Sequence, residues 1–234
     1  MDKRMEDIAK NLDKMKRQPE DTFKFGCDKC GKCCKFRYDI LLNPKDMFRA
    51  AKYLGETSVD FWKKYCDYYI GGTSKVPIIR LMWHGRDDHC VFFDEKSGCL
   101  IHDAKPNVCA LYPLGRYIEA GKMETPNDMS VDDIGFILQP ISCGDQKETH
   151  TVKGWLEHFN IPLKDEYWVK WNKFISLFSG YMRNNEKVLS DKRKGDLYNI
   201  SLFFIYLNYD MNKDFEPQFD KNAEYVLKQI GQEW

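Results

Sequence analysis

The chain has 234 residues, enough for one large domain or two small ones that bury a core without covalent cross-links. Its 36 Lys and Arg residues balance its 36 Asp and Glu residues, so net charge does not point to nucleic acid as a partner. The longest apolar stretch, 200–207, is far shorter than the roughly 18–20 residues of a membrane-spanning helix. With no secretory signal evident at the start, we expect a cytoplasmic protein with no membrane span.

The first segment, 1–19, is predicted to form an amphipathic helix that docks on the rest of the protein. Apolar residues recur there at alternating four- and three-residue steps, which places them on one narrow face. These residues are Met1, Met5, Ile8, Leu12 and Met15. Pro19 should end the helix.

Two further helices are expected after the first cysteines. In the segment 43–55, Asn43 should cap a helix that Gly55 ends. The segment 57–72 should form the second helix. Its Cys66 shares a face with apolar residues, which indicates a buried small side chain rather than a metal ligand.

The middle of the chain changes to β-branched and aromatic runs. The segments 75–84 and 89–94 are predicted to form a hairpin across the turn 85–88, and 115–119 a second hairpin with 122–125.

From residue 151 onward the apolar pattern is helical, in four segments: 151–159, 164–182, 196–207 and 220–230. The sequence therefore predicts an α+β fold, in which a cysteine-rich part with short hairpins and helices precedes a helical C-terminal part. We expect three segments: the helix 1–19, a metal-binding domain 20–150, and a helical region 151–234 packed on it.

Four cysteines lie within eight positions, in the segment 27–34. Cys27, Cys30 and Cys33 recur at every third residue, a spacing that lets a short loop wrap three thiolates around one inorganic centre. Cytosolic thiols are kept reduced, so such clusters indicate metal or redox chemistry more often than disulfides. Cys34 follows Cys33 directly, and in extended backbone its side chain would point away, toward a second centre or a supporting role.

Four later cysteines can complete the ligand set. With Cys66 set aside, eight thiols remain, enough for two four-ligand sites but no proof of two. The predicted metal ligands are Cys27, Cys30, Cys33, Cys34, Cys90, Cys99, Cys109 and Cys143. His89 and His102 lie close to cysteines, but a lone histidine is more often a structural hydrogen-bonding residue than a ligand.

The ordered pattern C-x2-C-x2-C-C, then C-V-F-F-D, G-C-L-I-H, K-P, C-x3-P and a later Cys-Gly resembles the YkgJ-type cysteine-cluster family over about residues 20–155. That family is described as a zinc- or iron-chelating domain, so the resemblance implies metal binding by these thiols. His102, Lys105 and Ala110 stand where members often carry tyrosine or arginine. An anion-binding role of that arginine is therefore not carried over. Some members resemble flagellin lysine N-methylase.

Iron is favoured over zinc, because structural zinc sites usually use two separated cysteine pairs and this loop has a third cysteine at the same spacing. We therefore expect a protein that holds an iron–sulfur cluster, in particular a four-iron four-sulfur cluster, with a redox or electron-transfer role and a redox or other protein partner. One alternative is a zinc-stabilised structural or interaction module. Another is a cluster-dependent protein lysine N-methylase, so the question of an enzymatic activity stays open.

Overall fold

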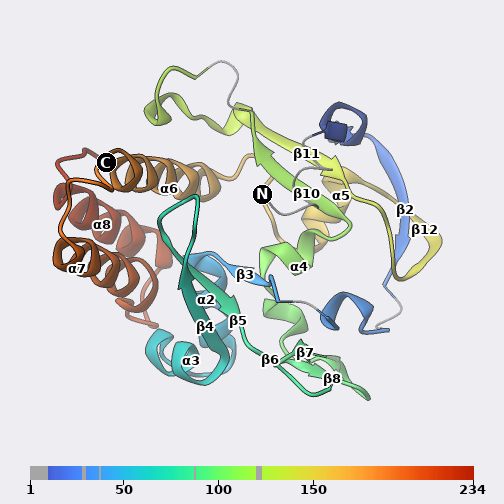
Figure 1. Ribbon diagram of the computed structural model, residues 1–234. Coiled ribbons are helices and arrows are strands. Elements are labelled where there is room, and N and C mark those ends of the chain that lie inside the picture. The colour runs from blue at the N-terminus through green and yellow to red at the C-terminus, as the bar shows by residue number, and fades with distance from the viewer. Residues whose placement is uncertain (1–9, 28–29, 37, 87, 120–122) are drawn as a thin grey trace. The chain divides into compact units, whose positions relative to one another are not determined.

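The computed structural model has an α+β fold, which confirms the predicted class (Figure 1). It describes residues 10–27, 30–36, 38–86, 88–119 and 123–234. The chain divides into two compact units, each built from two separate stretches: unit 1 is Met1–Cys33 with Val108–Val169, and unit 2 is Cys34–Asn107 with Lys170–Trp234. The predicted segments 1–19, 20–150 and 151–234 have other borders, and their standing as domains stays a prediction.

Unit 1 contains a three-stranded antiparallel sheet in the order β1–β11–β10. Its strands are β1 (Lys16–Arg17), β10 (Leu114–Ile118) and β11 (Ile134–Leu138). Phe136 and Ile137 of the central strand β11 are buried. Phe136 pairs with Arg17 of β1, and Ile137 pairs with Gly115 of β10. This apolar central strand explains why the two flanking segments pair with it.

Two predictions are wrong in this sheet. The first helix is seen over residues 10–15 and ends there, because Lys16 and Arg17 pair with β11; residues 1–9 lie outside the described part. Strand β10 pairs with β11 rather than with 122–125. The described residues 123–125 instead lead into a short 3-10 helix, which Thr125 caps by accepting from the N–H of Asn127 at 3.3 Å.

A second pair of strands, which the sequence did not predict, joins the two stretches of unit 1. Strand β2 (Thr22–Gly26) is antiparallel to β12 (Asp145–Thr151), and Figure 1 shows the two as one curved ribbon. Phe23 and Phe25 of β2 are buried, and both rings meet the ring of Trp155 edge-on at 5.9 and 5.5 Å. The ribbon is therefore held on the core of unit 1.

Two helices complete that core. Helix α5 (Val152–His158) confirms the helix predicted over 151–159, and α4 (Asn107–Leu111) enters unit 1 at Val108. The indole N–H of Trp155 donates to the carbonyl oxygens of Ala110 and Leu111, both at 3.2 Å. The last carbonyls of a helix lack partners within the helix, so these two hydrogen bonds from Trp155 fix the end of α4.

Unit 2 begins with the two helices expected there. Helix α2 (Pro44–Tyr53) has the predicted cap, in which the Asn43 side chain accepts from the N–H of Asp46 at 2.9 Å, and Gly55 follows it with φ +69°. Helix α3 (Ser58–Tyr65) is shorter than predicted.

The chain changes to strand at Cys66 because the aromatic and β-branched residues after it pair with a neighbouring strand. This strand belongs to a sheet in the order β3–β5–β4, whose strands are β3 (Leu41–Leu42), β4 (Cys66–Ile70) and β5 (Pro77–Leu81). Cys66 is buried, as predicted, although on a strand rather than a helix.

Two small hairpins of unit 2 carry cysteines. The predicted hairpin across 85–88 is confirmed only next to the turn, by β6 (Trp83–His84) and β7 (His89–Cys90); residue 87 lies outside the described part. The rest of the two predicted strands pairs elsewhere, because β5 joins the sheet with β3 and β4 and the end of the second segment pairs with 98–99. Strands β8 (Phe93–Asp94) and β9 (Gly98–Cys99) form the next hairpin.

The C-terminal part is helical, as predicted. Its elements are α6 (Glu166–Asn184), α7 (Asp191–Leu202), the π-helix η6 (Phe203–Leu207) and α8 (Phe215–Lys228). Within unit 2, the ring of Trp171 on α6 packs against those of Tyr206 and Phe219 at 5.9 and 6.5 Å. The aromatic stripe of α6 is therefore core, as expected. Short 3-10 helices are η1 (Lys32–Cys34), η2 (His102–Ala104), η4 (Pro126–Asp128) and η5 (Val131–Asp133).

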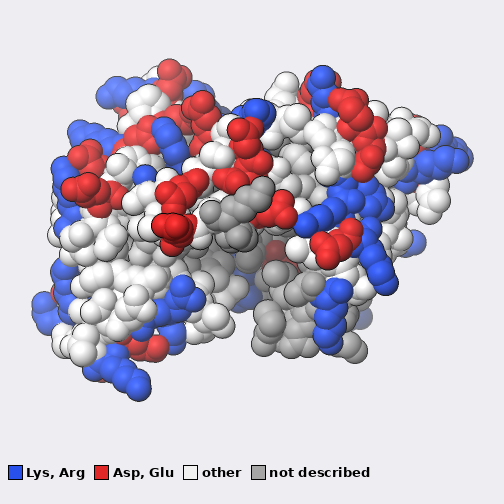
Figure 2. Space-filling model, turned by 90° about the horizontal axis from the view of Figure 1, so that it is seen from above, with Lys and Arg blue, Asp and Glu red and all other residues white. Residues whose placement is uncertain are grey.

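Among the described residues, no helix combines the length and the apolar character that crossing a bilayer requires. On the face displayed in Figure 2, acidic and basic side chains are interspersed, in keeping with the balanced charge of the sequence.

Candidate metal centre

The register of the β2–β12 ribbon brings two predicted ligands to the same end of unit 1. Gly26 at the end of β2 is paired with Asp145 at the start of β12. Cys27 directly follows Gly26, and Cys143 precedes Asp145 by two residues. The ribbon thus joins the loop of Cys27, Cys30 and Cys33 to the loop of Cys143, which lies far away in the sequence.

Two glycines let these loops come close. Gly144 has φ +75°, and a Cβ added there would lie 2.3 Å from the carbonyl oxygen of Gly26 and 2.7 Å from a ring carbon of Phe25. A Cβ on Gly26 would lie 2.5 Å from a carboxylate oxygen of Asp145. Only glycine fits both backbone positions without displacing a neighbour. The glycine beside Cys143 was noted in the sequence, but its partner in the first loop could not be seen there.

Cys143 is buried in the core of unit 1. It belongs to the core cluster that contains Phe25 and Leu114, and Cys33 packs against that cluster. The pKa of the Cys143 thiol is raised to about 11, mainly by burial and to a smaller extent by electrostatic interaction with Cys33, Cys30 and Cys27. The pairing of Gly26 with Asp145 and the contact of Cys33 with this cluster bring the loop of Cys143 to the loop of the first cysteines.

Tyr112 is a site residue that the sequence analysis missed. The backbone N–H of Ser142 donates to the phenol oxygen of Tyr112 at 2.9 Å, and the ring of Tyr112 meets that of Phe25 edge-on at 5.6 Å. A hydrogen bond with Tyr112 also lowers the pKa of Cys143, against the larger effect of burial. In the sequence, a tyrosine after an apolar helix reads as ordinary core, so no pattern signalled this role.

Unit 1 contains five of the eight predicted ligands, which differ in exposure. Cys27 and Cys30 are exposed, Cys33 and Cys109 are half-buried, and Cys143 is buried. Cys109 lies on α4, whose end Trp155 fixes. The centre thus combines an accessible side with a buried one.

The other three predicted ligands, Cys34, Cys90 and Cys99, lie in unit 2. Next to Cys34, the ammonium group of Lys35 is 5.3 Å from the ring centre of Phe93, the residue paired with Cys99. The loop of Cys34 therefore lies against the β8–β9 hairpin. Cys90 is buried in the preceding hairpin, while Cys34 and Cys99 are half-buried.

The two histidines next to cysteines have neighbours of their own. The ring of His89 lies edge-on to that of His84 at 4.6 Å, directly across the hairpin. His102 Nδ1 is 3.6 Å from a carboxylate oxygen of Asp103. Both positions agree with the structural role that a lone histidine usually has.

All nine cysteines are thiols rather than halves of disulfides. Within the described ranges, no three or more His, Cys, Asp or Glu side chains are already arranged to hold a metal ion. The chemistry of the donors nevertheless fits zinc or iron, since both are held in proteins by sets of thiolates. The thiols of unit 1 would therefore have to come closer together to bind an ion.

Residues 26–130 match the family model CxxCxxCC, which is described as a putative zinc- or iron-chelating domain. This segment of the chain is similar to that domain. This match confirms the predicted resemblance to the cysteine-cluster family and supports metal binding, without deciding between zinc and iron. No curated protein and no solved structure matches the chain. The matched segment ends before Cys143. The pairing of β2 with β12 nevertheless brings the loop of Cys143 to the first cysteines of that segment.

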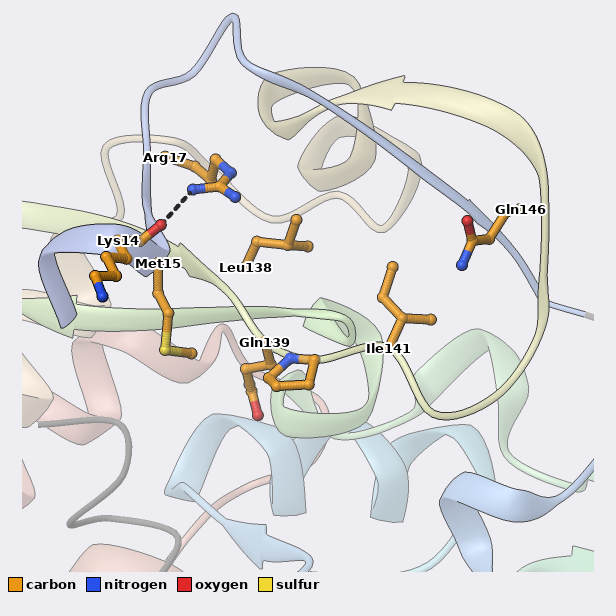
Figure 3. A pocket seen from close by; sticks show the side chains of 8 residues that line it. Lys14, Met15, Arg17, Leu138, Gln139, Ile141 and Gln146 are labelled. Atoms are coloured by element: carbon orange, nitrogen blue, oxygen red, sulfur yellow. Dashed lines mark hydrogen bonds between the residues drawn. The ribbon is translucent and has the colours of Figure 1, made fainter. Parts of the chain in front are cut away.

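A surface pocket of about 410 Å³ in unit 1 has Ile141 and Gln146, on either side of Cys143 in the chain, in its lining (Figure 3). Met15, Leu138 and Ile141 give it apolar walls, and Arg17 beside it donates to the backbone oxygen of Lys14 at 3.1 Å. Its lining, so far as the structure describes it, contains no cysteine.

Proposed function

We propose that the chain binds a metal centre through Cys27, Cys30, Cys33 and Cys143, and that this centre is an iron–sulfur cluster with a redox role. The observation that carries the proposal is the pairing of Gly26 with Asp145, which brings the loop of Cys143 to the loop of the first three cysteines, and Cys33 packs against the core cluster that contains Cys143. A group of thiolates that repel one another is stabilised by a bound cation.

The residues around the four thiols would give the centre a defined place. Gly26 and Gly144 allow the two loops to approach, and the core around Phe25 shields the side of Cys143 from water. Cys27 and Cys30 are exposed on the other side. When bound, an iron–sulfur cluster supplies one-electron transfer. A redox partner could approach it from the side of these two exposed residues.

Cys34, Cys90, Cys99 and Cys109 are retained as proposed ligands on the chemistry of their thiols. Lys35, which links the Cys34 loop to the hairpin of Cys99, supports a second grouping of cysteines in unit 2. A four-iron four-sulfur cluster suits the four thiols of unit 1 in number.

Zinc is the second candidate, because four thiolates are also a structural zinc site and the family description names both metals. In that case the protein is a zinc-stabilised structural or interaction module with a protein partner. The protein lysine N-methylase stays an alternative drawn from the resemblance alone.

The test is purification of the full chain without oxygen, followed by measurement of iron, zinc and acid-labile sulfide and by a visible spectrum. Iron with equimolar sulfide and a broad visible absorption supports the redox proposal, whereas stoichiometric zinc in colourless protein supports the structural module. Cys33→Ser should lose metal from unit 1, and Cys66→Ala is the matched control because Cys66 is buried and outside the set. Native protein with neither metal would refute both candidates.

A further inference from the structure

The hairpin of β6 and β7 in unit 2 carries two histidines directly opposite each other. His84 of β6 pairs with His89 of β7 in the antiparallel register, and Figure 1 shows the two strands next to each other. Directly opposed residues of an antiparallel pair point to the same face, with Cβ atoms about 4.5–5.5 Å apart. The two imidazole rings therefore leave the hairpin side by side.

The distance between the two rings is the one that a shared metal ion requires. The ring centres lie 4.6 Å apart, and the ring planes are at 87° to each other. An imidazole nitrogen binds Zn²⁺ at about 2.0–2.1 Å, which places the ion roughly 3.2 Å from the ring centre. Two imidazoles on one ion then have centres roughly 4.5–5.3 Å apart, for ligand angles of about 90° to 110°. The rings of His84 and His89 can therefore bind one ion by turning about their own side-chain bonds.

The surroundings hold the pair in place and leave it accessible. The ring of His89 meets that of Phe93 edge-on at 5.7 Å, and the N–H of Val91 donates to the carbonyl oxygen of Met82 at 3.0 Å, which continues the pairing beyond the hairpin. Ligands that are already positioned lose less conformational freedom when they bind. His84 is exposed and His89 is half-buried, so an ion from solution can reach both.

The turn between the two histidines carries charges of both signs in its described part. Arg86 is exposed, and the carboxylate of Asp88 accepts a hydrogen bond from the hydroxyl group of Tyr38 at 2.5 Å. Because Asp88 is held by Tyr38, the ligands that the hairpin offers are the two imidazoles. The turn also carries no excess of positive charge over these two residues that would repel a cation.

The pair lies on the face of the hairpin opposite to Cys90. Successive residues of a strand point to opposite faces. Cys90 follows His89, and it pairs with Trp83, which precedes His84. Cys90 is buried, whereas His84 is exposed. An ion held by the two histidines is therefore separate from any ion that Cys90 binds.

We propose that His84 and His89 form a second metal site, which holds a divalent transition-metal ion such as Zn²⁺ through one nitrogen of each ring, with water at the remaining positions. Imidazole suits this class of ion, whereas Mg²⁺ and Ca²⁺ take oxygen ligands. Taken alone, His89 has the packing of an ordinary structural histidine, but His84 supplies the second ligand. Two ligands on one hairpin bind far more tightly than one, because the second bond forms within the same molecule.

The test follows the ring resonances of the five histidines of the full chain by NMR while Zn²⁺ is added stepwise. Zn²⁺ has no redox chemistry, so it does not oxidise the thiols. A thiol reagent shows when the number of reactive thiols stops falling, which separates zinc bound by cysteines from zinc bound elsewhere. We expect the resonances of His84 and His89 to shift together with one midpoint, while those of His102, His150 and His158 stay in place.

Single substitutions in the pair measure how much the second ligand contributes. His84→Gln and His89→Gln each leave one imidazole and should weaken zinc binding at the other by about a hundredfold. His158→Gln is the matched control, because His158 is exposed like His84 and its ring lies against Trp155 and Phe159 in unit 1. This control should leave the midpoint of the pair unchanged.

The thiols provide a check that the site is separate. With Co²⁺ in place of Zn²⁺, the thiolate-to-cobalt absorption of the reduced, metal-free chain should be the same in His84→Gln and His89→Gln as in the native chain. A weaker absorption in these variants would place the histidines in the thiol site and overturn the proposal.

The native chain alone can also refute the shared ion, even if a variant fails to fold. Resonances of His84 and His89 that do not shift, that shift at different zinc concentrations, or that shift no more than those of the other three histidines would each overturn the proposal. If the thiols bind no metal but the two resonances shift together, the proposed function of the cysteines fails and the histidine site stands.

Discussion

The close approach of Gly144 to the first cysteine loop can be tested by one methyl group. In Gly144→Ala the new Cβ would meet the carbonyl oxygen of Gly26 at 2.3 Å and the ring of Phe25 at 2.7 Å. Neither is the end of a flexible side chain, so the backbone of the ribbon has to move. Overpacking of this kind costs about 1–3 kcal/mol, and the left-handed backbone at φ +75° adds about 1–2 kcal/mol for a residue with a Cβ. We therefore expect a loss of about 2–5 kcal/mol in the free energy of unfolding.

The control for this variant is Gly55→Ala. Gly55 has a similar φ of +69°, but a Cβ there meets nothing within 4 Å. It therefore shares the backbone cost of Gly144→Ala without the collision. Thermal and urea unfolding of the metal-free proteins should place Gly144→Ala below Gly55→Ala by about 1–3 kcal/mol, where each kcal/mol lowers Tm by about 2–4 °C.

Metal binding gives the same comparison a functional readout. Displacement of Gly144 moves Cys143 away from Cys27, so Gly144→Ala should also weaken Co²⁺ binding, whereas Gly55→Ala should not. If the two variants lose the same stability and bind Co²⁺ equally well, the two loops do not approach as the ribbon shows. The explanation of how Cys143 reaches the first cysteines would then be wrong.

Three further predictions concern the thiols and the core of unit 1. Cys143→Ser should reduce the metal content of the purified protein by at least half, while Cys66→Ala keeps it and loses about 1 kcal/mol of stability, as metal analysis and urea unfolding can show. In metal-free protein the pKa of Cys143 is raised from 9.0 to about 11, so its contribution to stability is full below pH 9 and is lost as the pH rises toward 11. Unfolding curves measured over this pH range should therefore show a decline in stability, and Cys143→Ser should lack the part of the decline that Cys143 causes. Asp165→Asn should lower the free energy of unfolding by about 3–5 kcal/mol, because it removes the carboxylate that lies 2.8 Å from the guanidinium of Arg116, a side chain only 1% exposed. Asp132→Asn, at the exposed pair with Lys164, should change the free energy of unfolding by less than about 1 kcal/mol.

Features set by neighbouring residues could be predicted from the sequence. The cap of α2 needs only Asn43 and Asp46, three residues apart, and the long helix α6 follows from its own apolar period. The spacing of Cys27, Cys30 and Cys33 likewise places three thiols in one loop without knowledge of the fold. Each of these depends on interactions within a few turns of chain, where residue type decides the conformation.

The features that were missed depend on contacts between distant segments. Strand β12 has a mostly polar, exposed sequence, so no alternation of apolar residues marked it. Its partner β2 belongs to the other stretch of unit 1, far away in the sequence. The switch from α3 to β4 at Cys66 depends on the presence of β5, because the residues after Cys66 pair with it. Local propensity is overridden in such places by pairing that only the folded chain provides.

The exposure of the four thiols of unit 1 implies an order in which a metal is bound. Cys27 and Cys30 are exposed and lie in the loop that follows β2, so they are the first thiols that an ion from solution meets. Cys143 keeps its proton at neutral pH because burial raises its pKa to about 11, and the ion has to displace that proton before the sulfur binds. Affinity should therefore rise with pH up to that value, and the last bond should also tie β12 to the first loop. On the proposed assignment, the final step of metal binding would be a step of folding, since a bond to Cys143 would stabilise the same ribbon that brings the loop of Cys143 to the first cysteines.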